Sequence, residues 1–408
     1  MPKMKKTDHN MAFILRLLLL SALLMAVSMP GQAQTSASAY SEKSEANRQD
    51  NDHNIKVYAE TVIEYTDNVF KFTESDREKM KANAVEDQAS GRFKDMDSDS
   101  DYIVSPELGL SLDSNSPVGG RFSLMSWLRY DYYTGNPELS HPEGRLRLRN
   151  SIGDNGELTL QGSFVCDFFK KNYLSGVNDA NANGNIPKSE RIYSSAVYDE
   201  YEGLMAYQHK IIDEKNNKLS GFDIQPFAGY DVRRYNSTFS NRDQDITFLG
   251  FGLDLEFISR IGLEMIYRYE WVSSPGDNEL ILFDETVSGA DVNGDGEIKR
   301  NAPVVTDIDR SSTRYTIEIN PSFKISRKAR LFAGYERRIT AYDSRNRLDI
   351  DHYDQETCRQ KISSGIKYDF SKAWSAQAEY IRTDEDEDAE DGDYTENRYL
   401  LKIKYNIK

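Results

Sequence analysis

The sequence has little cysteine, little histidine and no excess of positive charge. Its 408 residues include 2 Cys and 5 His, and 51 Lys and Arg stand against 67 Asp and Glu, which gives a formal net charge of −16. Binding to nucleic acid is disfavoured, because it needs a basic surface that neutralises phosphates. Catalysis is also disfavoured, because the few histidines show no Ser-His spacing and no paired-carboxylate motif accompanies them.

A second long apolar run is also missing. Apolar residues make up 38% of the chain, and after the N-terminus no stretch approaches the roughly 20 apolar residues that a membrane-spanning helix needs. A helical membrane bundle is therefore excluded. Hydropathy alone would indicate a soluble acidic protein of two or three domains. The 25 Tyr and 18 Phe do not fit that reading, and crossing a membrane with strands remains open.

Residues 1–33 have the three parts of a secretory signal peptide. Lysines at the start precede a long apolar segment, and Gly31-Gln32-Ala33 supplies a cleavage site of small residues. The alternative is an uncleaved membrane anchor, but Arg16 shortens the apolar run to a signal-like length. The predicted mature chain is exported, and residues 34–54, which lack any periodic pattern, are predicted to be a flexible periplasmic lead-in.

From Ile55 onward the dominant period is two residues, as in β-strands. In the last segment, for example, Tyr399, Leu401 and Ile403 alternate with polar side chains such as Lys402. We predict fourteen strands, at 55–70, 101–114, 120–135, 144–153, 157–171, 191–210, 219–235, 245–259, 261–274, 311–326, 329–343, 356–371, 374–384 and 394–408.

The connections between these segments alternate in length. Those after the even-numbered segments are short, whereas those after the odd-numbered ones are longer and acidic, above all 72–100 and 275–310. Short turns on one side and long loops on the other are typical of bacterial outer-membrane barrels. An even number of strands then puts both chain ends on the periplasmic side.

These patterns predict an all-β fold, a transmembrane antiparallel up-and-down β-barrel that occupies residues 55–408 as one domain. In such a barrel the apolar residues of each strand face lipid and the polar residues face a wet lumen. Cys166 and Cys358 lie on apolar faces of distant segments, so both are predicted to be unpaired. Aromatic residues near strand ends are predicted to form interfacial girdles, namely Trp127, Tyr130, Tyr132, Tyr267, Tyr269, Trp271, Trp374, Tyr399 and Tyr405.

Two motifs in the first quarter of the chain carry a family resemblance. The first segment ends in Glu64-Tyr65-Thr66-Asp67-Asn68-Val69-Phe70, and the second begins Asp101-Tyr102-Ile103-Val104-Ser105-Pro106. The pairing resembles a family of β-barrel porins associated with exopolysaccharide and capsule gene clusters. The resemblance is specific only over residues 60–135. It implies an outer-membrane channel or scaffold that serves polysaccharide export. The chain departs from barrel-insertion signals in ending Tyr405-Asn406-Ile407-Lys408, without a terminal aromatic residue.

Two loops have the residue pattern of calcium sites. The first, from Asp179 to Glu190, matches the spacing of a calcium-binding loop throughout. The second, from Asp291 to Glu297, has the better first half but lacks an acid at the last position. Each has the alternative of an ion-free turn. The candidate ligands are Asp179, Asn181, Asn183, Asn185, Glu190, Asp291, Asn293, Asp295 and Glu297.

Two further runs of acids lie in predicted outer loops. One places Asp95, Asp97, Asp99 and Asp101 at every second residue, and the other covers Asp384–Asp393. Such runs are usually solvated loop tips. On an outer membrane they would also attract the divalent cations that bridge lipopolysaccharide, which is a hypothesis that a calcium titration tests.

The polar faces of the strands supply candidates for a pore lining. Basic members of the set outnumber acidic ones, so the wall is predicted to be mixed to basic and to favour anionic solutes such as acidic sugars. The alternative is that ion pairs fill the lumen, since fourteen strands lie between filled small barrels and open large ones. The predicted lining residues are Arg145, Arg147, Arg149, Glu264, Arg268, Arg314, Glu318, Lys324, Lys361, Lys367, Lys402 and Lys404.

The sequence therefore predicts an outer-membrane channel for polysaccharide or other polar, anionic solutes. The alternative is a structural or surface-interaction barrel with a filled lumen and calcium-ordered outer loops. Expected partners are outer-membrane lipid and lipopolysaccharide, the barrel-insertion machinery and a polysaccharide. An enzymatic barrel would have to use His352 beside Asp351, and nothing else in the sequence supports it.

Overall fold

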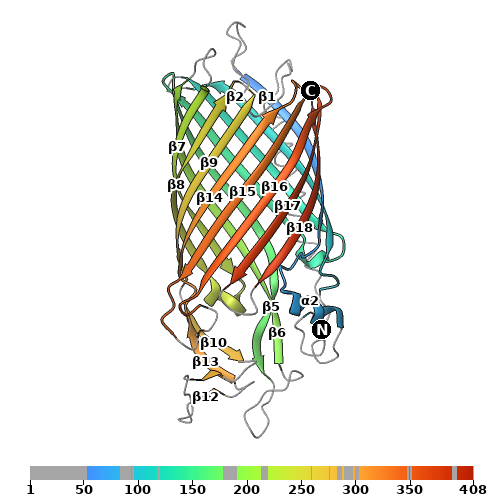
Figure 1. The fold of residues 1–408 in the computed structure, drawn as a ribbon, viewed down its shortest axis with the longest axis vertical. Coiled ribbons are helices and arrows are strands. Elements are labelled where there is room, and N and C mark those ends of the chain that lie inside the picture. Colours follow the sequence, from blue (N-terminus) through green and yellow to red (C-terminus); the bar gives the residue numbers. More distant parts are fainter. Residues whose placement is uncertain are drawn as a thin grey trace. The chain divides into compact units, whose positions relative to one another are not determined.

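Fourteen antiparallel strands of the chain close into one barrel in the computed structural model (Figure 1). The structure describes residues 53–82, 93, 96–116, 120–177, 191–212, 219–258, 260–274, 276–282, 287–288, 297–298, 303–346, 349, 352–387 and 393–407. The barrel strands are β1 (His53–Thr66), β2 (Asp101–Asn115), β3 (Arg121–Tyr133), β4 (His141–Ile152), β5 (Gly156–Val177), β6 (Arg191–Ile212), β7 (Leu219–Tyr235), β8 (Gln244–Phe257), β9 (Ile261–Ser273), β14 (Ser312–Lys324), β15 (Ala329–Tyr342), β16 (Glu356–Asp369), β17 (Trp374–Glu387) and β18 (Tyr394–Ile407).

The first and last barrel strands pair with each other and so leave no free sheet edge. Residues 57–66 of β1 pair antiparallel with residues 398–407 of β18. All other barrel neighbours are consecutive along the chain, with β9 pairing to β14. The predicted fold class and the fourteen predicted strands are confirmed.

The period-two pattern sorts the strand residues onto two faces. In β18, Tyr399, Leu401 and Ile403 are exposed on the outer face, while Lys402 on the other face pairs with Glu60 of β1 at 2.9 Å. The same arrangement recurs around the barrel, so large apolar side chains cover its outside and charged side chains line its inside. This distribution is the reverse of a soluble β protein, in which the apolar face is buried.

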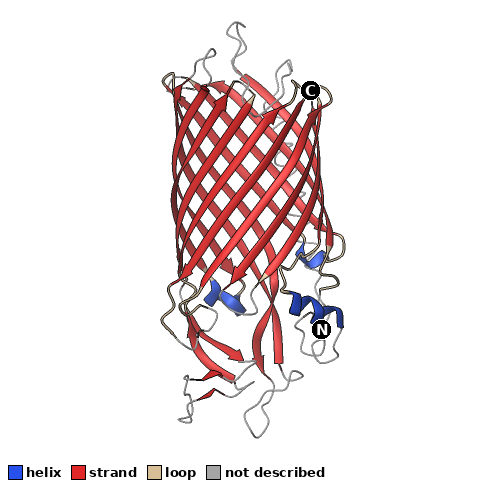
Figure 2. Ribbon diagram, in the orientation of Figure 1, coloured by secondary structure: helices blue, strands red, loops and turns tan. Residues whose placement is uncertain are grey.

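The long connections gather at one end of the barrel and the short turns at the other, with the C-terminus beside the short turns (Figure 1). Three features of the long connections were not predicted. A helix, α2 (Glu74–Ala82), lies between β1 and β2. Between β9 and β14, β10 (Asp277–Leu282) pairs with β13 (Pro303–Ile308), and β11 (Val287–Ser288) pairs with β12 (Glu297–Ile298) (Figure 2).

The largest cluster of buried apolar side chains lies among the connections rather than within the barrel wall. Phe70, Phe72 and Met96 of the β1–β2 connection pack with Leu139 of the β3–β4 connection and Phe169 of β5. Leu139 belongs to the short helix η1 (Pro137–Leu139). Burial of these side chains fixes the β1–β2 connection to the ends of β3–β6.

Two predictions about particular side chains have different outcomes. Both cysteines are unpaired, as predicted. Trp127 is not part of an outer girdle, because it pairs with Gly109 on the inner face and lies under the guanidinium groups of Arg129 and Arg145, at 5.7 and 5.2 Å from its ring centre. The other predicted girdle aromatics lie on the outer face. The cation–π contacts with Arg129 and Arg145, rather than a membrane interface, therefore explain why a tryptophan stands at this position.

Several predictions concern residues outside the described part of the chain. These are the signal peptide, most of the lead-in, and the side chains of both candidate calcium loops. Among the helices in the described ranges, none has the length and apolar character to cross a membrane.

Candidate functional site

The candidate site is the inner face of the barrel. All twelve predicted lining residues lie on this face, because each occupies an inward position in the alternation of its strand. Whether they line an open path for solutes stays a prediction. For description we divide the inner face into a long-loop half and a short-turn half, named after the connections that each half adjoins.

The short-turn half is open to water. Small inner-face residues such as Ser363, Gly365 and Gly334 are only half-buried, so part of their surface stays accessible to water. Asp254 on the same face of β8 is exposed, and Lys367 and Lys404 are half-buried. A side-chain-filled barrel would bury such residues, so this half of the lumen is wet.

The long-loop half is packed. Phe248 and Ile246 of β8 face inward and are each only 1% exposed, and Val272 of β9 is 4% exposed. Arg268 lies over the Phe248 ring, with its guanidinium carbon 3.7 Å from the ring centre. Ile103 of β2 and Ile381 of β17 are also buried on the inner face. The long-loop half is therefore the more tightly packed half of the described inner face.

Charged groups of the long-loop half form close pairs across neighbouring strands. Arg398 of β18 donates two hydrogen bonds to the Glu64 carboxylate of β1, at 2.6 and 2.8 Å. Arg359 donates to Glu336 at 2.6 Å. Two-point and short charge-assisted bonds of this kind are stronger than neutral ones and fix side-chain orientation. The pairs therefore brace the wall where the barrel is packed.

The short-turn half also contains ion pairs, such as Lys324–Glu256 at 3.0 Å, but in addition it places several like charges side by side. Register places Lys324 opposite Arg330, and Arg330 opposite Lys367, which makes a basic row across β14–β16. Asp223 stands opposite Asp254 in the neighbouring strands β7 and β8, and Glu264 of β9 follows. Facing like charges cost stability, and water in the open lumen reduces that cost.

The acidic row corrects one sequence-based prediction. The wall was predicted to be mixed to basic, but that prediction left out Asp223 and Asp254. Acidic rows and basic rows occupy adjacent arcs of the described wall, so the lumen is mixed rather than basic. A charged solute in the lumen would therefore meet separate acidic and basic patches of the wall.

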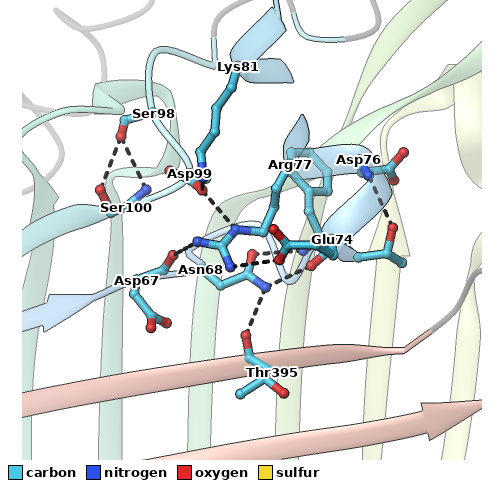
Figure 3. A network of polar contacts seen from close by, with 12 residues as sticks. Asp67, Asn68, Glu74, Asp76, Arg77, Lys81, Ser98, Asp99, Ser100 and Thr395 are labelled. Atoms are coloured by element: carbon cyan, nitrogen blue, oxygen red, sulfur yellow. Dashed lines mark hydrogen bonds and ion pairs between the residues drawn. The ribbon is translucent and has the colours of Figure 1, made fainter. Parts of the chain in front are cut away.

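The Tyr-x-Asp-Asn motif at the end of β1 anchors the β1–β2 connection to the last strand. Asp67 accepts hydrogen bonds from the backbone N–H and side-chain amide of Asn397, at 2.7 and 2.8 Å. Asn68 is fully buried and donates to the carbonyl oxygens of Phe72 and Thr395, at 2.8 and 3.0 Å (Figure 3). The motif thus stabilises the seam where the barrel closes.

The second motif, at the start of β2, anchors the β1–β2 connection to the β3–β4 connection on its other side. The Asp101 carboxylate accepts hydrogen bonds from the backbone N–H groups of Gly135 and Asn136, both at 2.8 Å. Asn136 in turn accepts from the backbone N–H of Asp97 at 2.9 Å. Both motifs of the family resemblance therefore have a structural role at the long-loop rim.

Helix α2 is tied to the same rim by ion pairs (Figure 3). Arg77 donates to the Asp99 carboxylate at 2.8 Å and to the Asp67 carbonyl oxygen at 3.1 Å, and Lys81 lies 3.0 Å from Asp99. Partial burial disfavours the Asp99 charge, but hydrogen bonds from Arg77 and Lys81 outweigh it and lower the pKa of Asp99 below its usual value.

Several described members of the two acidic runs are not the solvated loop-tip residues that were predicted. Asp99 and Asp101 are engaged in the rim contacts, and Asp101 begins β2. Asp384–Glu387, the first part of the Asp384–Asp393 run, belongs to β17 rather than to a loop. Arg382 donates to Asp384 at 2.8 and 2.9 Å. Asp99, Asp101 and Asp384 therefore have protein partners, whereas Asp386 is exposed, and Asp95 and residues 388–392 lie outside the described residues.

The described residues show no metal cage at this site. In the described ranges, no group of three or more His, Cys, Asp or Glu side chains is arranged to hold an ion. His352 pairs with Asp349 at 2.6 Å and its ring packs on Tyr342; its sequence neighbour Asp351 lies outside the described residues. The predicted calcium ligands are likewise outside them, except for the backbone of Glu297 in β12.

Comparison with known proteins gives structural similarity only. The sequence matches no protein-family model, and no curated protein sequence matches it. Similar solved structures include a bacterial polysaccharide outer-membrane secretin (9% identity, TM-score 0.42, covering 86% of this chain and 98% of that one). An anion-selective porin from Comamonas acidovorans has 11% identity, a TM-score of 0.35 and coverage of 87% and 100%.

A third similar structure is the outer-membrane channel DcaP of Acinetobacter baumannii, with 11% identity, a TM-score of 0.43 and coverage of 90% of this chain and 99% of that one. Similarities of this size carry no argument about which solute the present chain would bind. The function must be argued from the barrel itself.

Proposed function

We propose that the chain is an outer-membrane β-barrel that forms a channel for polar solutes. The observation that carries the proposal is the pairing of an apolar outer face with a charged, half-exposed inner face in a closed barrel. An outer surface covered by large apolar side chains would aggregate in water. Closed barrels satisfy all backbone hydrogen bonds and are stable in lipid.

The orientation of the barrel in the membrane follows from the lengths of the connections at its two ends. Outer-membrane barrels have short periplasmic turns and longer extracellular loops. We therefore place the short-turn half toward the periplasm and the β1–β2 connection with α2 toward the cell exterior. The predicted signal peptide supports export, and the outer loops would meet lipopolysaccharide.

Polysaccharide is the solute class that we favour. The wall presents charges of both signs, and carbohydrates offer many hydroxyl groups to such donors and acceptors. The family resemblance at Asp67-Asn68 and Asp101 implies the same class. A mixed wall disfavours selection for anions alone, so neutral and acidic chains are both candidates.

Single-channel recording tests the channel. The full chain, without its signal peptide, would be folded into detergent and inserted into planar lipid bilayers. We expect discrete conductance steps in salt solution. An inserted barrel that produces no steps at any voltage would contradict the proposal.

The alternative is a structural barrel with a closed lumen. It is favoured by one observation, the packed long-loop half around Phe248 and Ile246. The two functions separate in the same recording, because a closed barrel inserts without conductance.

Calcium binding is a separate proposal about the outer loops. It rests on the sequence patterns at Asp179–Glu190 and Asp291–Glu297. Calcium should raise the melting temperature of the folded barrel, because an ion that binds only the native state stabilises it. Replacing Asp179 and Glu190 together by Asn and Gln should abolish part of that rise, and an unchanged melting temperature in calcium would count against both sites.

A further inference from the structure

Aromatic rings follow one another across five strands on the inner face of the long-loop half. The centres of consecutive rings, from Tyr133 of β3 through His141, Phe168 and Tyr198 to Tyr235 of β7, lie 6.2, 4.9, 5.0 and 5.1 Å apart. We call these five residues the ring ladder. Because barrel strands tilt, a row that crosses them also climbs along the barrel axis.

A β-bulge places the middle ring of the ladder. Val165 faces Glu200 and Phe168 faces Tyr198, so Cys166 and Asp167 together oppose the single residue Asp199. With regular alternation Phe168 would point away from the lumen, because it follows the inward Val165 by three residues. The extra residue turns Phe168 inward, next to Tyr198.

The bulge is held in an unfavourable backbone conformation. Asp167 has φ of 55°, a region that residues other than glycine seldom adopt. Its backbone N–H donates to the Asp199 carboxylate at 2.8 Å. Such strain persists only where surrounding contacts hold it in place, and here the bond to Asp199 and the packing of Phe168 against Tyr198 do so.

Packing of the β1–β2 connection explains only one end of the ladder. Tyr133 contacts the buried apolar cluster of Phe70 and Phe72. Phe168, Tyr198 and Tyr235 are half-buried and do not belong to that cluster. Three neighbouring rings on the inner face therefore keep part of their surface accessible.

A row of charged side chains lies beside the rings. Each is the next inward-facing residue of its strand, counted from the ring toward the middle of the barrel. Asp131 and Glu143 flank Tyr133 and His141, and both lie against Arg129. Glu200 accepts a hydrogen bond of 2.8 Å from Arg233 beside Tyr198 and Tyr235. A row of aromatic rings thus borders a row of hydrogen-bonding groups.

We propose that the ring ladder is a binding track for a chain of pyranose sugars. A sugar ring has an apolar face of C–H groups and a rim of hydroxyl groups, so it matches an aromatic face beside charged acceptors and donors. The ring spacing is of the order of one sugar residue, which lets successive sugars contact successive rings. The inference rests on the proposed channel function, since the ladder meets a sugar chain only if the lumen admits one.

Calorimetry on the detergent-solubilised full barrel tests the track without requiring conductance. The probes are maltohexaose, which is neutral, and hexagalacturonate, which is anionic. We expect at least one to bind, and Tyr198→Leu to weaken that binding roughly 5- to 10-fold because leucine keeps apolar bulk but lacks a flat ring. Tyr235→Leu should weaken it similarly.

The matched control is Tyr201→Leu on the same strand. Tyr201 faces outward and is 49% exposed, so its replacement should leave sugar affinity unchanged. The proposal is overturned if neither probe binds, or if Tyr198→Leu and Tyr235→Leu bind as well as the parent barrel. Sugar binding without conductance steps would refute the channel function but support the binding track. Conductance steps without sugar binding would support the channel function and refute the track.

Discussion

The two halves of the lumen use the same kinds of residue in opposite ways. In the long-loop half, Phe248 is buried under Arg268 and Glu64 is held by two bonds from Arg398. In the short-turn half, Phe332 is half-buried, and Lys324, Arg330 and Lys367 stand side by side. We therefore expect the long-loop half to select solutes by direct contact with its side chains. We expect the short-turn half to select them by the electric field of its charged rows.

The largest expected effect concerns the stability of the packed half. Glu64→Gln should lower the free energy of unfolding by about 2–3 kcal/mol, because Glu64 is buried and its loss leaves the Arg398 charge unpaired. Glu157→Gln is the matched change in the short-turn half, where Arg149 lies 3.6 Å away and both side chains are half-exposed; it should cost less than about 0.5 kcal/mol. Urea unfolding in lipid vesicles measures both losses of stability. Equal losses would show that ion pairs stabilise the two halves of the barrel to the same extent.

The next effect concerns where the lumen is narrowest. Phe248→Ala removes a buried ring from the packed half and should raise single-channel conductance about twofold, because the narrowest section dominates pore resistance. Phe332→Ala removes a ring from the wet half and should leave conductance nearly unchanged. If the Phe332 variant conducts more than the Phe248 variant, the narrow section lies in the short-turn half.

A smaller effect should separate the charged rows of the wet half. Lys367→Gln weakens the basic row and should shift the reversal potential in a salt gradient toward cation selectivity. Asp254→Asn weakens the acidic row and should shift it in the opposite direction. Shifts of the same sign, or shifts that persist in molar salt where charges are screened, would show that these rows do not act on the permeating ions.

The smallest effect concerns the ion pairs of α2 at the long-loop rim. The pKa of Asp99 is lowered in the folded protein, so its pairs with Arg77 and Lys81 contribute fully above the usual value of 3.8. That contribution, about 0.2–1 kcal/mol for such partly exposed pairs, is lost as the pH falls through the lowered pKa. The protection factors of the α2 amides, which compare each exchange rate with the intrinsic rate at the same pH, should therefore fall at acid pH, and Asp99→Asn should lower them already at neutral pH.

Strand positions could be predicted from the sequence because a period of two is a local signal. In β18 the alternation of Tyr399, Leu401 and Ile403 with Lys402 sets both the strand and its faces. The inward direction of Phe168 was not predictable in this way. It depends on the bulge at Asp167, and the sequence contains no glycine there that would mark a left-handed residue.

Side-chain partners were harder to predict than side-chain faces. Trp127 was assigned to an outer girdle from its residue type, but its alternation with Arg129 and its pairing with Gly109 put it in the lumen. His352 was considered beside Asp351, whereas a turn brings it to Asp349. In both cases a neighbour on another strand or turn decided the outcome.

By itself the sequence determined the number of strands, their two faces and the sorting of loops by length, because each is written within a few neighbouring residues. Only the tertiary structure decided which half of the lumen is packed, which charges pair and which rings form a ladder. Glu64 and Arg398 lie at opposite ends of the chain and meet only because β1 and β18 close the barrel in one register. Register between distant strands is a property of the whole closed sheet, so no local pattern contains it.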